Sequence, residues 1–201
     1  MHQYKELTGL TRLAMIALWA HALTKFLYGC GEAYGDNIAD GSLSSSLLAL
    51  IGLTALLSLF ALFVSIVLVA LWIYRANANA HAIGGDLTIT PGWAVGWYFV
   101  PFANLVKPYE AMKETWLASH FGSNWGAGEA TDLLRWWWGL WILNNILGNI
   151  AWRTSEFAPA FSGDFYFIIG AVEIPLTYIL VRIMTQIRDA QKATRHAEVF
   201  A

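Results

Sequence analysis

The sequence predicts an all-α membrane protein, with four transmembrane helices, a short re-entrant or interfacial helix and an amphipathic helix on the cytoplasmic side. Hydrophobic residues make up 57% of the 201 residues and charged residues only 13%, compared with about 25% charged in a soluble domain. Several apolar runs reach about 20 residues, the length that a helix needs to cross a hydrocarbon core. Eleven tryptophans are typical of proteins that have aromatic belts at the membrane surface. We expect a single membrane domain over residues 1–201.

The first two predicted spans are the apolar runs at residues 10–29 and 47–74. The second run carries no charged residue, and because it is longer than a crossing requires, it can tilt or project beyond the bilayer. Residues 31–46 are acidic and rich in Gly and Ser, which is typical of an exposed loop. The polar residues 76–90 then form a connector, in which Asn77 and Asn79 are suited to capping the second span.

Cys30 is the only cysteine, so the chain forms no internal disulfide. It follows Tyr28 and Gly29, which together loosely resemble a lipoprotein cleavage box after a hydrophobic signal. His21 and Lys25 interrupt the apolar region, and Tyr28 is bulky where a small residue is usual. We therefore favour an uncleaved first span over the lipoprotein alternative.

The stretch at residues 91–116 predicts two short helical pieces. Its conspicuous residues recur at four-residue spacing, which places side chains along one helical face: Trp93, Trp97, Pro101, then Asn104, Pro108, Met112, Trp116. The two internal prolines argue against one unbroken helix and favour a break at residues 104–108. At about 1.5 Å per residue the front piece is too short to cross the bilayer, so we expect it to be re-entrant or interfacial. The charged back piece is either solvated or a docking face.

Two further spans are predicted at residues 133–152 and 165–184. The first of these begins with Arg135 and three consecutive tryptophans, as at a membrane boundary. The second contains Pro175, which we expect to break it. Residues 117–132 and 153–164 are polar loops, and residues 185–201 form a polar tail that we expect to be a fraying helix.

The distribution of basic residues predicts the orientation. With four spans and a non-crossing stretch at residues 93–106, one side receives ten of the twelve basic residues: Lys5, Arg12, Arg75, Lys107, Lys113, Arg135, Arg182, Arg188, Lys192 and Arg195. Lys25 and Arg153 lie towards the other side. Because cytoplasmic loops carry the excess of Lys and Arg, both termini are predicted to be in the cytoplasm.

Three segments carry a resemblance to a known family: WIYRANANAHAIGG, PGWAVGWYFVPFANLVKPYEAMKETW and WWWGLWILNNILGNI. They resemble the bacterial membrane family catalogued as domain of unknown function 4328, over about residues 59–189. The matching motif residues are Trp93, Trp97, Pro101, Phe102, Asn104, Pro108, Met112, Glu114 and Trp116, with Asn145, Gly148 and Asn149 in the third span. The resemblance implies an integral protein of the bacterial inner (cytoplasmic) membrane, and it implies no activity.

A mid-membrane polar cluster is the candidate functional site: His21, Lys25, Asn144, Asn145, Asn149 and Glu173. Counted from the middle of each span, His21, Asn144, Asn145 and Glu173 lie at similar depth. A carboxylate at the bilayer centre costs about 2.5–3.5 kcal/mol on insertion scales, so Glu173 requires a partner, which Lys25 or His21 can supply. The cluster is either a relay or binding pocket, or hydrogen-bonding glue between helices, and we favour glue.

The sequence predicts neither a cofactor nor a metal. The five histidines are scattered, whereas zinc and haem sites need ligands grouped together. HExxH, GxSxG and P-loop motifs do not occur, so we expect no enzyme. No basic run suggests nucleic-acid binding. The expected partners are the lipid bilayer and either another protein or a second copy of the chain.

Three functions are therefore in competition. The favoured hypothesis is a non-catalytic scaffold or accessory subunit of a membrane assembly. The alternative is a small transporter or channel for protons, ions or a small molecule that uses the polar cluster. An intramembrane enzyme has only Glu173 and His21 as acid–base groups.

Overall fold

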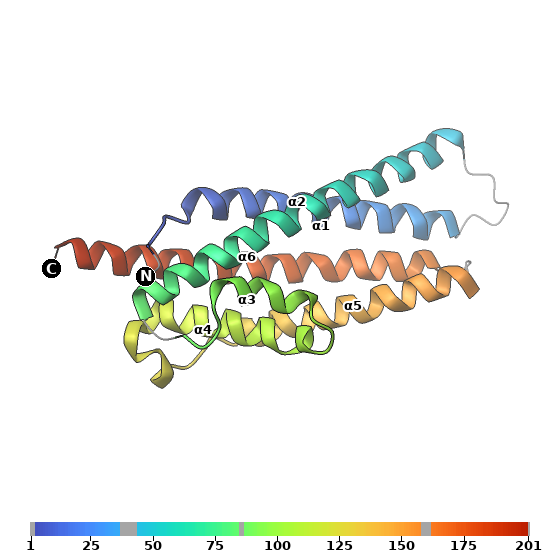
Figure 1. Cartoon of the computed structure of the whole chain (residues 1–201). Helices are drawn as coiled ribbons and strands as arrows, with labels where there is room; N and C mark the ends of the chain where they lie inside the picture. The colour runs from blue at the N-terminus through green and yellow to red at the C-terminus, as the bar shows by residue number, and fades with distance from the viewer. Residues whose placement is uncertain (1–2, 37–43, 85–86, 158–161, 201) are drawn as a thin grey trace. The chain divides into compact units, whose positions relative to one another are not determined.

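A computed structural model describes residues 3–36, 44–84, 87–157 and 162–200, and these residues form helices, turns and short connections without any strand (Figure 1). The helices are α1 (Thr8–Asp36), α2 (Ser45–Gly84), α3 (Pro91–Gly96), η1 (Trp97–Phe99), η2 (Ala103–Leu105), α4 (Lys107–Phe121), η3 (Gly122–Ala127), α5 (Leu133–Phe157) and α6 (Ser162–Phe200). The all-α fold class is thus confirmed.

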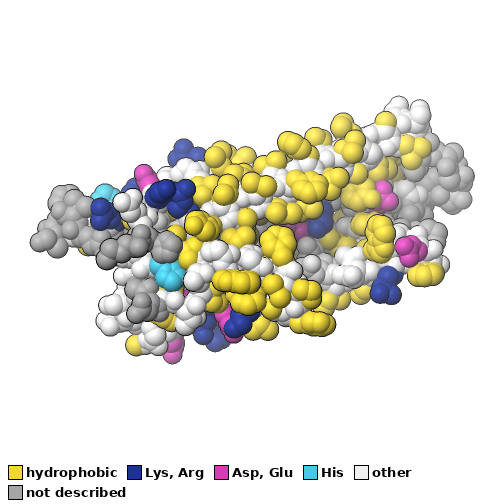
Figure 2. All heavy atoms as spheres, viewed as in Figure 1, with side chains coloured by type: hydrophobic (Ala, Val, Ile, Leu, Met, Phe, Trp, Pro, Cys, Tyr) yellow, Lys and Arg dark blue, Asp and Glu magenta, His cyan; other side chains and the backbone are white. Residues whose placement is uncertain are grey.

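Three helices are long and apolar enough to cross a membrane: Thr8–Gly35, Ser45–Gly84 and Gly163–Ala197. These helices indicate a membrane protein. Hydrophobic side chains cover much of the face seen in the space-filling view (Figure 2). The helix α5 is not among the three, because its tryptophans, asparagines and Arg135 lower its mean hydropathy. The count of four spans therefore stays a prediction.

The long helices run further than the apolar runs that predict them. The helix α2 continues to Gly84 and α6 spans Ser162–Phe200, so most of the expected connector at residues 76–90 and the described part of the tail are helical. Pro175 lies inside α6 without ending it. A membrane helix tolerates such a proline, because neighbouring groups and local adjustment satisfy the freed carbonyl. Asp40 and the centre of the predicted acidic loop lie outside the described residues.

The stretch at residues 91–121 is broken, as predicted, but the break begins earlier than residues 104–108. The helix α3 ends at Gly96, and Val100 is extended with φ −96° and ψ 114°, because the ring of Pro101 disfavours a helical residue before it. Phe102 then adopts φ 62°. Pro108 lies in the first turn of α4, where its missing N–H costs nothing.

The loop predicted at residues 117–132 begins later in the structure than the sequence suggests. The helix α4 continues to Phe121, and Leu117, Ala118 and Ser119 are buried.

Contacts divide the chain into two compact units. Unit 1 comprises Met1–Met15, Val67–Trp138 and Ile179–Ala201, and unit 2 comprises Ile16–Ile66 and Gly139–Tyr178. The helices α1, α2, α5 and α6 each contribute to both units.

In unit 2, α1 and α6 approach one another at glycines. A Cβ on Gly29 would lie 2.5 Å from the carbonyl oxygen of Tyr166, and a Cβ on Gly170 would lie 2.8 Å from Cα of Phe26. A Cβ on Gly163 would meet the backbone of Glu32. As residue numbers increase along α1, the numbers of the facing residues on α6 decrease, so these segments are antiparallel. Small residues at the interface allow such close packing of membrane helices.

Candidate functional site

Lys25 and Glu173 form an ion pair inside unit 2. Lys25 Nζ of α1 donates to Glu173 Oε2 of α6 over 3.1 Å, and the two side chains are 27% and 10% exposed. The pairing follows from the α1–α6 interface, because Gly170 of α6 lies against Phe26 and the carbonyl of Lys25. Of the two partners that the sequence left open for Glu173, Lys25 is therefore the one that binds it.

Asn144 of α5 adds a second donor to the same carboxylate oxygen. Its Nδ2 lies 2.8 Å from Glu173 Oε2, so Asn144 does join two helices, as the glue hypothesis requires. Its own Oδ1 is buried and has no hydrogen-bond partner. A buried acceptor without a donor costs about 1–3 kcal/mol, so Asn144 is only half satisfied here.

His21 lies beside the ion pair and bonds elsewhere. Its side chain is 5% exposed, and Nδ1 donates to the backbone carbonyl of Ser58 on α2 over 3.2 Å. A carbonyl can only accept, so this bond places a proton on Nδ1. His21 is close enough to interact electrostatically with both Lys25 and Glu173.

Asn145 and Asn149 are exposed and bond their own helix. Their Nδ2 atoms donate over 2.8 Å to the carbonyls of Trp141 and Asn145, four residues earlier on α5. Neither bond links two helices. Both residues are exposed, so the donor and acceptor groups of each amide that these bonds do not use are open to solvent or a ligand.

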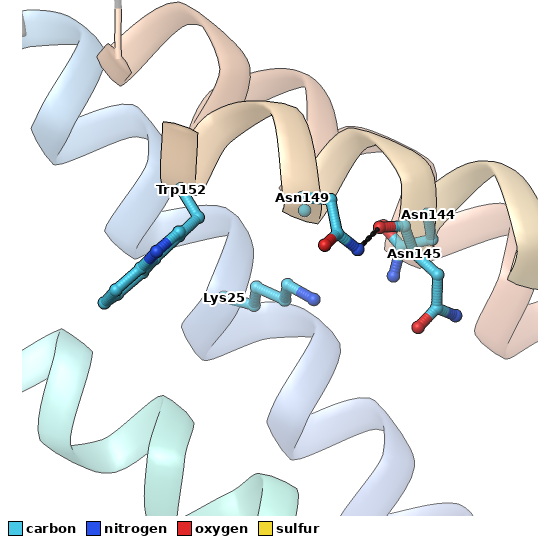
Figure 3. A pocket seen from close by; sticks show the side chains of 6 residues that line it. Lys25, Asn144, Asn145, Asn149 and Trp152 are labelled. Atoms are coloured by element: carbon cyan, nitrogen blue, oxygen red, sulfur yellow. Dashed lines mark hydrogen bonds between the residues drawn. The ribbon is translucent and has the colours of Figure 1, made fainter. Parts of the chain in front are cut away.

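These residues surround a hollow of about 300 Å³ (Figure 3). Its lining is formed by Lys25, Asn144, Asn145, Gly148, Asn149 and Trp152. Lys25 extends from α1 towards the asparagines of α5, and Trp152 lies at one end of the group (Figure 3). The volume is at the lower end of the range for small-molecule sites.

The hollow is lined by the cation of the ion pair and not by its anion. Lys25 has three N–H donors, and one of them is used by Glu173. The more deeply buried carboxylate does not contribute to the lining. A bound molecule would therefore meet an ammonium group, several amides and an indole.

The family-motif residues between 93 and 116 lie in unit 1 and divide into buried and exposed groups, whereas Asn145, Gly148 and Asn149 belong to unit 2. Pro108 and Met112 are buried on α4, and Trp116 donates through Nε1 to Gln186 over 3.1 Å. Glu114 accepts from the backbone N–H groups of Thr88 and Ile89 at 3.0 and 3.1 Å.

The front of the motif is open. The Trp93 and Trp97 rings lie 4.4 Å apart, Pro101 is exposed and Phe102 is 87% exposed, while Asn104 is half-buried. The part of the motif at residues 93–116 therefore forms packing and loop contacts in unit 1, whereas its residues Asn145 and Asn149 belong to the polar cluster of unit 2.

A buried amide network in unit 1 was missed at the level of sequence. Gln191 is fully buried, and its Nε2 donates to the carbonyl of Ala76 and to Ser119 Oγ, each over 2.9 Å. Its Oε1 accepts from Asn79 Nδ2 at 2.9 Å. Asn77 is also fully buried and donates to Thr115 Oγ1 over 3.0 Å. The prediction that Asn77 and Asn79 cap the second span is thus wrong. The sequence signal that could have indicated the network is that polar residues continue at helical spacing beyond Arg75.

A metal site is not evident in the part of the chain that the structure describes, where no three His, Cys, Asp or Glu residues lie close enough to hold an ion.

The comparisons with known proteins give one match. No curated protein and no solved structure matches the chain. A family model matches residues 39–186, and so begins 20 residues earlier than the expected start at residue 59. The match includes Asn144 and Glu173, whereas His21 and Lys25 precede it. Since the match covers well over half of the chain, this protein belongs to the family described as Domain of unknown function (DUF4328).

Proposed function

We propose that this protein is a non-catalytic multi-pass protein of the bacterial inner membrane that binds a small polar molecule at the hollow beside Lys25. The observation that carries the proposal is the hollow itself. It brings together an ammonium group from α1 and three asparagines from α5, and α1 is apolar enough to cross a membrane. Polar groups inside membrane helices are costly, and they often belong to ion or substrate pathways.

The proposed topology has four spans, α1, α2, α5 and α6, with both termini in the cytoplasm. The antiparallel α1–α6 interface supports this number. If α5 did not cross, or if residues 93–106 formed a fifth crossing, α1 and α6 would run in the same direction through the bilayer. The ten-to-two division of basic residues supports the orientation.

Cysteine labelling tests the topology. In a Cys30→Ser background, we expect Ser46→Cys to react with a membrane-impermeant maleimide on intact cells. Ser123→Cys, which lies in the exposed part of η3, should react only after permeabilisation. Equal labelling of both positions on intact cells would contradict four spans.

Filling the hollow tests the binding proposal. A Cβ on Gly148 meets no atom within 4 Å, so Gly148→Leu would fill the hollow without a backbone clash. Gly139→Leu is the matched control, because Gly139 is also open, lies on the same helix and does not line the hollow. We expect small polar solutes that raise the thermal stability of the purified protein to lose this effect in Gly148→Leu and to keep it in Gly139→Leu. Equal stabilisation of both variants would place binding elsewhere.

The accessory-subunit hypothesis is the second candidate, and the apolar surface of α2 favours it. Leu56, Phe60 and Phe63 are 68%, 69% and 59% exposed. These side chains suit a partner helix and lipid chains equally well. This hypothesis predicts a stoichiometric partner after mild solubilisation of native membranes, together with unchanged partner binding in Gly148→Leu.

A further inference from the structure

We propose that the hollow takes an anionic oxygen group, a carboxylate or a phosphate, and that the site takes up one proton at Glu173 when the anion binds to Lys25. This inference rests on the proposed binding function and names the ligand class. It follows from three features of unit 2: which member of the ion pair lines the hollow, what else surrounds Glu173, and how little water reaches it.

The lining selects an anion. Lys25 is the charged residue in the wall, and it keeps two N–H donors after its bond to Glu173. The second N–H groups of Asn145 and Asn149 are further donors. Charge-assisted bonds to carboxylate or phosphate oxygens are roughly twice as strong as neutral ones. A cation would instead have to approach the ammonium group.

The anion creates a charge that Glu173 must relieve. Without ligand, Lys25 and Glu173 cancel one another. When an anion shares the ammonium group, Glu173, with its side chain 10% exposed, retains Asn144 as its other hydrogen-bond donor. An uncompensated buried charge costs several kcal/mol, so protonation is the less costly state.

The exchange balances in charge. Lys25⁺·Glu173⁻ plus an anion and a proton gives Lys25⁺·anion⁻·Glu173–H, and the site is neutral before and after. No covalent bond forms or breaks apart from the new O–H bond on Glu173.

Among the residues that the structure describes, His21 lies near Glu173 and can compete for the proton. The titratable groups in electrostatic range of Glu173 include Lys25 and His21, both on α1. The α5 helix contributes the neutral Asn144, and the apolar run of α2 carries no charge between residues 47 and 74. His21→Asn therefore separates protonation of His21 from protonation of Glu173.

The anionic group can belong to a free molecule or to a lipid headgroup. The volume of about 300 Å³ admits a small acid. Trp152 and Ile146, which are 66% and 52% exposed on the same helix, would suit the acyl chains of a lipid. Acetate and inorganic phosphate are the probes for the first source. Nanodiscs of phosphatidylglycerol compared with phosphatidylcholine are the probe for the second.

The variants separate the role of the ammonium group from that of the proton acceptor. Lys25→Met with Glu173→Gln removes the ammonium group without leaving a buried charge. Glu173→Gln alone keeps the ammonium group and removes the proton acceptor. Lys25→Arg keeps a cation at this position and is expected to keep anion binding.

The experiment measures anion affinity and proton uptake on the purified full chain, with a pH indicator in weakly buffered solution. In the wild type and His21→Asn, we expect one proton taken up per anion and an affinity that rises about tenfold for each unit fall in pH. In Glu173→Gln, binding should persist without proton uptake and without dependence on pH. The Lys25→Met, Glu173→Gln double variant should bind neither acetate, phosphate nor phosphatidylglycerol.

The contrary results are distinguishable. Anion binding that survives in the double variant, or that takes up no proton in the wild type, overturns the inference. Neutral solutes that bind the hollow while anions do not would overturn it as well and would leave the proposed function standing. If the protein binds no solute whose binding Gly148→Leu blocks, both the inference and the proposed function fail.

Discussion

Separating Lys25 from Glu173 should show how strongly the two residues depend on one another. At 3.1 Å and an effective dielectric constant of about 20, their Coulomb attraction is about 5 kcal/mol before desolvation is subtracted. Lys25→Met leaves the carboxylate buried with Asn144, and we expect a loss of about 3 kcal/mol. Glu173→Gln should cost about 1–2 kcal/mol, because Lys25 is 27% exposed and can be hydrated. Combining them should cost less than Lys25→Met alone.

The assay is a double-mutant cycle, with unfolding of the detergent-solubilised protein followed by circular dichroism as the mole fraction of dodecyl sulfate rises. We expect a coupling free energy of about 1–3 kcal/mol. The matched control is Lys107 with Glu110, a pair whose side chains are 44% and 41% exposed, where coupling should stay below about 1 kcal/mol. Additive effects of the two unit 2 substitutions, within about 0.5 kcal/mol, would refute this account of the pair.

Three further predictions concern the packing and the N-terminal segment. Gly170→Ala should destabilise the protein by about 1–3 kcal/mol, because the new methyl group meets the backbone of Phe26 at 2.8 Å. Gly148→Ala should change the stability little, because that position is open. Equal effects of the two substitutions in thermal unfolding would contradict the close α1–α6 interface. Gln191→Leu should cost about 2–4 kcal/mol in the same assay, since three buried partners lose their bonds; a neutral effect would show that the network contributes nothing. Burial, with a nearby carboxylate, raises the pKa of the Tyr4 phenol above 10.0. The contribution of Tyr4 to folding stability is therefore full below pH 10.0 and is lost as the pH rises through the raised pKa of the folded state. Tyr4→Phe should remove this part of the loss of stability at alkaline pH.

The sequence predicts the helical class and the need of Glu173 for a partner because both depend on local or one-dimensional information. Long apolar runs require helices in a bilayer, and a carboxylate at mid-span requires a partner at similar depth. Depth alone left Lys25 and His21 equivalent. The choice between them depends on which helix faces which, and the glycines that bring α1 against α6 become informative only when both helices are seen together.

Helix ends and the amide network could not be predicted in this way. Hydropathy ends a span where polar residues begin, but α2 and α6 continue as helices because their polar residues bond one another across unit 1. Asn79 and Gln191 are 112 positions apart, and nothing in their local sequence connects them. The hollow has the same origin, since Lys25 and Asn149 come from helices that are distant in sequence.

The most direct test of the central claim is to observe the ammonium group of Lys25 while ligand is added. With ¹⁵N-labelled lysine side chains, and with the signal assigned by its loss in Lys25→Arg, acetate should shift the Lys25 Nζ resonance in a saturable manner. The resonance of Lys107, whose ammonium group is paired at the protein surface, should not move, and Gly148→Leu should abolish the Lys25 shift. A Lys25 resonance that stays fixed while the protein binds acetate, or that moves only in parallel with Lys107, would contradict a binding site at this hollow.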